Sequence, residues 1–182
     1  MGQYYNPVLL KETEDKPRTW FYAWDFSNGL KLMEHSYLSN NFVGTVCNQL
    51  VNKAQRVVWA GDYADEEKGT EGQGYEGQGL NIYSLCENVP KSRARISYDN
   101  KKYPIIINHT TKEFVDTSKI KPDADGWEIH PLPLLTVEGN GRGGGDYNGA
   151  DDYVGLWARH LIEIKSVAPK EYEEIHPDFT EH

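Results

Sequence analysis

Residues 39–60, SNNFVGTVCNQLVNKAQRVVWA, set one helix directly before one strand. Six apolar residues recur at the three- and four-residue spacing that lines one face of a helix: Phe42, Val43, Val46, Cys47, Leu50 and Val51. Ser39 or Asn40 can cap the start of this helix, and Asn52 can end it. The pattern predicts one clear helix over residues 41–52, with Cys47 in the core rather than acting as a nucleophile.

Short strand-like runs lie on both sides of this helix in the sequence. Aromatic and branched residues dominate seven runs, which we predict to be strands: Tyr4–Leu10, Thr19–Phe26, Arg56–Ala60, Tyr103–Ile107, Glu113–Asp116, Leu134–Val137 and Tyr153–Val167. The connection Asn108–Lys112 has the length and chemistry of a hairpin turn, and Leu80–Glu87 fits either a helical turn or a strand. The sequence thus predicts a single α+β domain, mainly an antiparallel sheet of short strands with one clear helix and long loops.

The length of the chain suits one folding unit. Of its 182 residues, we assign 1–168 to a single domain. A tandem Glu-Gly-Gln-Gly repeat makes residues 68–79 a predicted mobile loop, and residues 138–152 form a glycine-rich loop. Residues 169–182 are an acidic C-terminal tail, which we expect to be loosely held.

Charge and composition narrow the classes of partner. A net charge of −9 and a pI near 5.1 argue against binding of double-stranded nucleic acid, which needs clustered Lys and Arg. The densest basic segment, Lys91–Arg95 with Lys101 and Lys102, is interrupted by Asp99 and is predicted to be a solvated edge. Two cysteines are too few for a disulfide framework. No run reaches the roughly 20 apolar residues of a membrane span, so we expect a cytoplasmic protein without membrane contact.

The glycine-rich loop is the strongest candidate for a ligand site. Its six glycines let backbone N–H groups approach an anion, and Arg142 adds a planar fork for phosphate or carboxylate. Asp146 can orient Arg142, accept a ribose hydroxyl or bind a metal, and Tyr147 can stack on a ring. Residues 139–144 match G-x-G-x-x-G, but a helix does not follow, so the requirements of a dinucleotide fingerprint are not met. The alternative interpretation is a long hairpin loop without a ligand.

Two further sets of residues lie beside predicted strands. Trp59, Asp62 and Tyr63 place a carboxylate between two aromatic rings at a strand end, which suits a pocket wall. Alternatively, Trp59 belongs to the core and Asp62 caps a turn. Among the histidines, His35 and His130 adjoin the most rigid sequence. No spacing places two histidine ligands on one face, so no metal site and no cofactor are expected.

Several segments resemble a family of uncharacterised bacterial and phage-borne proteins: residues 1–5, 28–36, 59–65, 108–110, 130–136, 140–147, 154–155 and 157–158. The most specific element is Asn-Gly-Arg-Gly-Gly-Gly-Asp-Tyr at residues 140–147, whereas the Gly/Gln repeat looks like an insertion of this chain. The family has no established activity, and the resemblance implies only a cytosolic setting.

The leading hypothesis is a non-enzymatic binding protein for a small anionic ligand, most plausibly a nucleotide or a nucleotide-derived signal; in a phage, it would sequester a host defence signal. We expect loop and aromatic residues to form the site: Asn140, Gly141, Arg142, Gly143, Gly144, Gly145, Asp146, Tyr147, Trp59, Asp62, Tyr63, His35 and Trp157. The first alternative is a metal-assisted hydrolase of a nucleotide or phosphorylated substrate, with Asp62, Asp146 and His130 converging as catalytic residues. The second is a protein–protein inhibitor with an acidic aromatic surface, and a homo-oligomer is left open.

Overall fold

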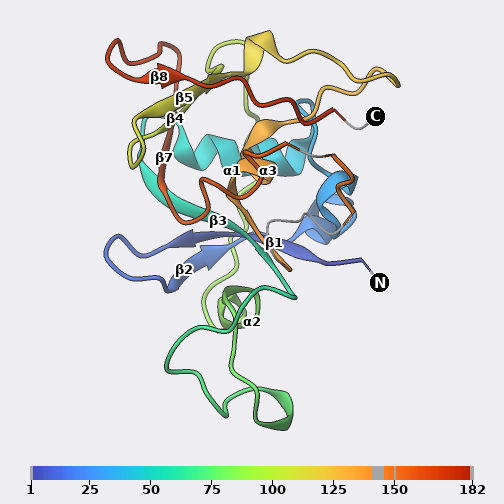
Figure 1. Ribbon diagram of the computed structural model, residues 1–182, viewed down its shortest axis with the longest axis vertical. Helices are drawn as coiled ribbons and strands as arrows, with labels where there is room; N and C mark the ends of the chain where they lie inside the picture. The colour runs from blue at the N-terminus through green and yellow to red at the C-terminus, as the bar shows by residue number, and fades with distance from the viewer. Residues whose placement is uncertain (1, 141–145, 150, 181–182) are drawn as a thin grey trace.

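A computed structural model describes residues 2–140, 146–149 and 151–180 of the chain (Figure 1). Eight strands of the described part form one sheet: β1 Tyr5–Leu10, β2 Pro17–Trp20, β3 Gln55–Gly61, β4 Ile105–Asn108, β5 Glu113–Asp116, β6 Val137–Glu138, β7 Leu161–Lys165 and β8 Glu173–Glu174. Its helices are the α-helices α1 Asn41–Leu50, α2 Ile82–Cys86 and α3 Pro131–Thr136, and the 3₁₀-helices η1 Ala23–Phe26, η2 Leu32–Glu34, η3 Tyr75–Gly77 and η4 Thr117–Lys119.

The sheet is mainly antiparallel, and its strand order is β2-β1-β3-β7-β4-β5-β8. The pairs β3–β6 and β5–β8 are parallel, whereas β1–β2, β1–β3, β3–β7, β4–β7 and β4–β5 are antiparallel. Strand β3 pairs with β1 and also with two other strands, because Arg56 faces Leu161 of β7 and Trp59 faces Val137 of β6. The predicted α+β fold with a mainly antiparallel sheet of short strands is therefore confirmed.

Both faces of the sheet are covered at β1 and β3. Alternate side chains of a strand point to opposite faces, so Val57 and Trp59 join the cluster that contains α1, and Val58 and Ala60 pack with Ile82 of α2. Figure 1 shows α1 and α2 on opposite sides of these strands. This explains why every residue of β1 is buried, although one-sided antiparallel strands alternate between buried and exposed positions.

Helix α1 forms where the apolar stripe predicts it. The Asn40 side chain accepts hydrogen bonds from the N–H groups of Phe42 and Val43, which caps the first turn. Cys47 is completely buried, as expected for a core residue. The helix ends at Leu50, two residues before the predicted end. With 10 residues, α1 is the longest helix of the described part, and no helix there has the length and apolar character that crossing a bilayer needs.

Three predicted strands are shorter than expected. The run Thr19–Phe26 stops being a strand after Trp20 and continues into η1. The run Leu134–Val137 lies mostly in α3, because Pro131 occupies the first helical turn and the His130 side chain caps it. The run Tyr153–Val167 is a strand only in β7. The ambiguous segment Leu80–Glu87 contains the short helix α2.

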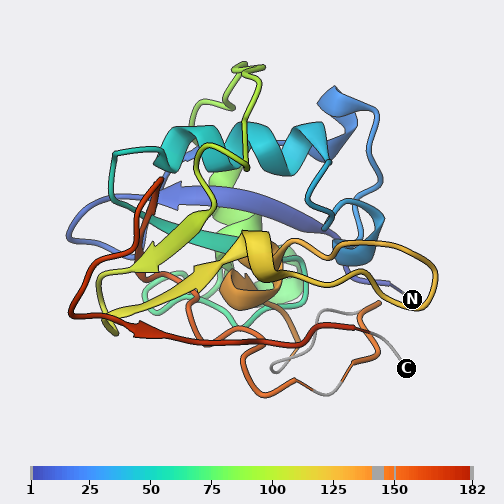
Figure 2. The same ribbon diagram turned by 90° about the horizontal axis from the view of Figure 1, so that it is seen from above.

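The prediction of a loosely held C-terminal tail is wrong for its described part. Strand β8 pairs with β5, and Figure 2 shows this last segment running beside β5. Ile175 and Phe179 are buried, with 5% and 4% of their surface exposed. The prediction rested on the acidic composition of the segment and did not weigh these two apolar residues. Their burial holds the segment against the domain.

Candidate functional site

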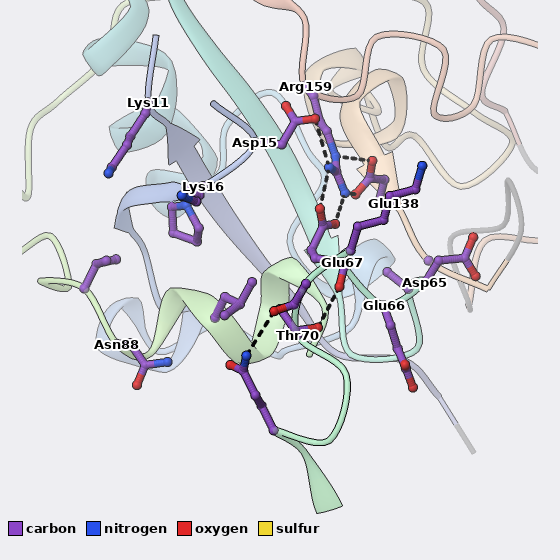
Figure 3. Close-up of a pocket in the computed structure, with 18 residues that line it drawn as sticks. Lys11, Asp15, Lys16, Asp65, Glu66, Glu67, Thr70, Asn88, Glu138 and Arg159 are labelled. Carbon is purple, nitrogen blue, oxygen red and sulfur yellow. Dashed lines mark hydrogen bonds and ion pairs between the residues drawn. The ribbon is translucent and has the colours of Figure 1, made fainter. Parts of the chain in front are cut away.

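A cleft of about 1030 Å³ opens at the end of the molecule that carries α2 (Figure 3). Its walls come from the β1–β2 turn, the segment after β3, α2, β6 and Arg159. The acidic segment Asp65–Glu67 and Gly139, the first glycine of the glycine-rich loop, both line it. The cleft thus borders the two predicted regions, but none of the described residues predicted for the ligand site lines it.

Arg159 stands in the wall of this cleft among three carboxylates. Its Nε and Nη2 atoms bind the two oxygens of Glu138 at 2.7 and 2.9 Å. Its Nη1 atom lies 3.1 Å from one oxygen of Glu67, and Nη2 binds the other oxygen. Asp15 approaches Nη1 at 3.4 Å. Burial alone would lower the pKa of Arg159, but the hydrogen bonds to Glu67 and Glu138 raise it above its usual value.

The backbone holds Arg159 in an unusual conformation. Its φ of 65° lies in the left-handed region, which costs a residue other than glycine about 1 to 3 kcal/mol. The Arg159 N–H donates to the carbonyl of Val57 in β3, and its own carbonyl accepts from Nε of Arg56. Upstream, Gly155 has a φ of 74°, and its N–H donates to Leu134. These bonds fix the turn that carries the guanidinium into the cleft.

A second arginine extends the network to the β1–β2 turn. Asp15 lies between Arg56 and Arg159 and binds both guanidinium groups. The hydrogen bond from Arg56 lowers the pKa of Asp15 most, so this carboxylate is ionised at neutral pH. Arg56 also donates to the carbonyl of Glu14 at 3.0 Å. Four separate segments of the chain are thus tied together along one wall of the cleft.

The lysines of the cleft are more loosely engaged than Arg159. Lys11 and Lys16 share Glu14 at 3.5 and 3.3 Å, and their side chains are 52% and 66% exposed. Lys68 also lines the cleft. Figure 3 shows Lys11 and Lys16 on one side of the cleft and the Arg159 cluster on the other. The cleft therefore has accessible ammonium groups facing a fixed, carboxylate-rich wall.

The glycine-rich loop is described only at its two ends. Asn140 donates its N–H to the side chain of Gln3 at 3.3 Å, and Asp146 accepts from the N–H of Met33 at 3.1 Å. The other Asp146 oxygen is buried and accepts no hydrogen bond from the described residues, and burial raises the pKa of this carboxyl. The predicted anion-binding residues Gly141, Arg142, Gly143, Gly144 and Gly145 lie outside the described residues. Tyr147 is buried and packs edge-on against Phe179.

Trp59 and His35 form a buried pair in the core. The indole N–H of Trp59 donates to Nε2 of His35 at 3.0 Å, so the proton of this imidazole is on Nδ1, which donates to the carbonyl of Gly29. Burial lowers the pKa of His35 to about 4, and the ring is neutral at physiological pH. Both residues are completely buried, which supports the core interpretation of Trp59.

The charges of Asp62 and Asp146 both act on the buried hydroxyl of Tyr5. The pKa of Tyr5 is raised by burial and further by the charges of Asp146 and Asp62. Asp62 also accepts a hydrogen bond from the N–H of Tyr4 at 3.1 Å, and its neighbour Tyr63 is 48% exposed. The two carboxylates accept hydrogen bonds from different segments, Asp62 from the N–H of Tyr4 and Asp146 from the N–H of Met33.

The third predicted catalytic residue, His130, is enclosed in the core. Its Nδ1 atom accepts the N–H of Leu132 at 3.2 Å, and its Nε2 atom lies 3.4 Å from the thiol of Cys47. Burial lowers the pKa of His130 to about 3. The described residues contain no group of three or more His, Cys, Asp or Glu that could hold a metal ion. The arrangement predicted for a metal-assisted hydrolase is therefore not formed by this part of the chain.

Trp157 is likewise a buried residue, and its indole N–H donates to Glu113 at 3.0 Å.

Comparison with protein-family models, curated proteins and solved structures gives no match to this chain. The resemblance to phage-borne proteins stays a prediction.

Sequence reasoning missed Arg159. Its one local signal is that it is a charged residue between the buried Trp157 and the start of β7.

Proposed function

We propose that this chain binds a small anionic ligand, a nucleotide or a nucleotide-derived signal, in the cleft beside Arg159 and releases it unchanged. The observation that carries the proposal is the distribution of charge across the cleft, with Lys11 and Lys16 on one side and carboxylates on the other (Figure 3). A nucleotide has a matching polarity, because its phosphate is an anion and its ribose and base carry hydroxyl and amino donors.

The chemistry of each wall fits one part of a nucleotide. The ammonium groups of Lys11 and Lys16 are mobile point charges that suit a phosphate. Asp65 and Glu66 supply acceptors for ribose hydroxyls. Leu85 and Val89 add apolar surface on which a base can lie. The volume of about 1030 Å³ is at the upper end of the range for small-molecule sites, about 300 to 1,000 Å³.

The Arg159 cluster acts as the scaffold of the site. Its guanidinium donors are all directed at Glu67, Glu138 and Asp15, so they hold these carboxylates in place instead of contacting a ligand. A wall fixed before binding lowers the entropic cost of ordering it when the ligand arrives. The same cluster places Gly139 at the rim of the cleft, where the glycine-rich loop begins.

Binding without turnover is favoured by the lining of the cleft. Its described residues include no His, Cys or Ser, and two of its carboxylates, Glu67 and Glu138, are bound by Arg159. The hydroxyl of Thr70 has a structural role, because it donates to the backbone carbonyl of Glu67 and accepts from the N–H of Leu80. A nucleotide in the cleft would therefore meet carboxylates and ammonium groups but no His, Cys or Ser side chain.

The test is a thermal-shift and calorimetric titration with nucleoside monophosphates, triphosphates and cyclic nucleotides. A ligand at about 100 times its Kd stabilises the folded state by about 2.7 kcal/mol, which is a readily measured rise in Tm. We expect Lys11→Ala combined with Lys16→Ala to remove most of this rise. Lys101→Ala, which changes an exposed lysine outside the cleft, is the matched control.

A separate variant distinguishes the cleft from the glycine-rich loop. Arg142→Ala should weaken binding if the loop closes on the ligand in the cleft. A nucleotide-induced rise in Tm that survives the double lysine substitution intact would place the ligand elsewhere. Hydrolysis of the nucleotide during the titration, seen by chromatography of the released ligand, would contradict binding without turnover.

A further inference from the structure

Residues 89–98 cross the edge of the sheet as an extended segment. Lys91 bridges to Trp20 at the end of β2, and the N–H of Ser92 donates to the Trp20 carbonyl at 2.8 Å. Further along, the carbonyl of Ile96 accepts from the hydroxyl of Thr45 in α1 at 3.3 Å. Figure 2 shows this yellow-green part of the chain passing over α1. The segment is therefore tied to the domain at both ends.

The extended conformation places three cations on one face of this segment. Lys91, Arg93 and Arg95 are exposed, whereas the intervening Ser92 and Ala94 are partly covered. Side chains two residues apart on an extended chain are about 7 Å apart. We call Lys91, Arg93 and Arg95 the basic strip. Their regular spacing is comparable to that of the phosphates along an extended single strand of nucleic acid.

Aromatic rings from η1 and from Tyr22, the residue before it, support the basic strip. The Lys91 ammonium lies 5.2 Å from the ring centre of Tyr22, and the Arg95 guanidinium lies 4.8 Å from that of Phe26. Lys91 also pairs with Asp25 at 2.7 Å. Beside this pair, Trp24 is 67% exposed, so a large indole surface faces solvent. Cation–π contacts hold the strip in place while Trp24 stays accessible.

Two hollows meet at Arg95. One, of about 310 Å³, is lined by Asp25, Phe26 and the segment from Lys91 to Arg95. The other, of about 430 Å³, is lined by Phe26, Arg95, the start of α1 and the residues up to Asn100. The two hollows share Phe26 and Arg95 in their walls, and we call them together the trough. The trough shares no lining residue with the Arg159 cleft.

We infer that this trough binds single-stranded nucleic acid, with phosphates along the basic strip and a base stacked on Trp24, which neighbours Asp25 in η1 and lies outside the lining of the two hollows. Proteins that bind single strands combine a cationic groove with exposed aromatic rings, and the rings tolerate any base because every base has a π face. A duplex is disfavoured, because its phosphates are more densely charged and the chain carries a net charge of −9. An acidic peptide would use the cations but would leave the exposed indole without a stacking partner.

The charge balance of the trough sets the expected strength of binding. Asp25 neutralises Lys91 in part, so Arg93 and Arg95 supply most of the attraction. For single strands the logarithm of the binding constant falls with the logarithm of salt concentration by about 0.7 for each phosphate contacted. Two or three contacts therefore predict a slope of about −1.4 to −2, with modest affinity at low salt.

The test is fluorescence anisotropy of a labelled oligothymidylate with the whole chain at low salt. We expect saturable binding, a salt slope in this range, and a loss of about fivefold or more in affinity for Arg93→Ala and for Trp24→Ala. Arg93 is the cleanest cation to change, because it is exposed and makes no ion pair among the described residues. Lys101→Ala, which removes an exposed lysine outside the trough, should leave the affinity unchanged.

Three outcomes would overturn the inference. The first is no binding of oligothymidylate at low salt. The second is binding that Arg93→Ala and Trp24→Ala leave unchanged, with Tm showing that both variants are folded. The third is equal competition by poly-glutamate, which would assign the trough to an acidic peptide.

Discussion

Arg159 and Glu138 form a two-point ion pair, with Nε to Oε1 at 2.7 Å and Nη2 to Oε2 at 2.9 Å. Glu138 is the last residue of β6 and the first residue of the predicted glycine-rich loop. The pair therefore anchors the start of that loop to the turn before β7. Since Glu67 shares the same guanidinium, the pair also couples the loop to the segment after β3.

Arg159→Met should destabilise the fold through these carboxylates. The variant leaves Glu67 and Glu138, whose side chains are only 17% and 27% exposed, without their common cation. We expect the free energy of unfolding, measured by urea denaturation, to fall by about 2 to 4 kcal/mol. Lys119→Met is the control, because its pair with Glu174 is formed by a lysine that is 55% exposed, and its loss should change the free energy of unfolding much less. Equal losses in the two variants would contradict a special role for Arg159.

Stability should fall in mild acid because of His35 and His130. Their folded pKa values, about 4 and about 3, lie below the unfolded value of about 6.5. The unfolded chain therefore takes up these protons first, and stability present above pH 6.5 is lost as the pH falls toward 4. Each histidine contributes a slope of up to about 1.4 kcal/mol per pH unit. The carboxyls of Asp62 and Asp146 have the opposite effect on stability. Burial raises their pKa values, so the folded state takes up their protons first and gains stability as the pH falls.

The measurement is urea denaturation across this pH range. His35→Asn should flatten the slope and lower the stability at neutral pH, because the bond to Trp59 is weakened. The matched control is His176→Asn, whose side chain is 70% exposed. A slope that is the same in the wild type and in His35→Asn would show that His35 is not the source.

Gly155→Ala should be more costly than a change at an ordinary glycine turn. Both Gly155 and Gly69 have positive φ, of 74° and 83°. A Cβ at Gly155 would lie 2.8 Å from the carbonyl oxygen of Val137, whereas a Cβ at Gly69 meets nothing within 4 Å. We expect Gly69→Ala to cost about 1 kcal/mol from the backbone alone, and Gly155→Ala to cost clearly more. Thermal unfolding of the two variants compares them directly, and equal values of Tm would contradict the predicted clash.

Phe179→Ala tests whether the tail is part of the domain. Phe179 is 4% exposed and packs against Tyr147, so its removal should cost about 3 kcal/mol. Tyr75→Ala, at a side chain that is 81% exposed, should change stability by less than about 0.5 kcal/mol. Urea denaturation distinguishes the two variants. A Phe179→Ala variant with an unchanged free energy of unfolding would show that the tail is loosely held.

Local pattern was enough to predict α1 and most of the strands. The stripe from Phe42 to Val51 and the β-branched runs encode their own periodicity, so the helix and the hairpin of β4 and β5 follow from them. The helix α3 was missed because Pro131 and Pro133 disguise a helical turn whose cap is a histidine. Local pattern also failed at the C-terminal tail, where the buried Ile175 and Phe179 hold the segment against the domain although the residues around them are acidic.

The candidate site was less accessible to sequence reasoning. Arg159, Glu67 and Asp15 are distant in sequence, and only the tertiary fold shows that they share one network. Besides burial, the charges of Asp146 and Asp62 raise the pKa of Tyr5. His35, His130 and Trp59 are core residues whose side-chain nitrogens all have partners. Aromatic and histidine side chains beside strands carry no sequence signal that separates a pocket wall from a core.

Strand β7 lies between β3 and β4 in the sheet, although it is made of residues 161–165. The half of the sheet that contains β1, β2 and β3 and the half that contains β4 and β5 are both complete in the chain well before β7 emerges from the ribosome. Until those five residues are released, each half presents an open edge to other nascent chains. Cells that produce this protein therefore meet its greatest risk of aggregation late in translation, and slow decoding just before β7 should lower the yield of native protein.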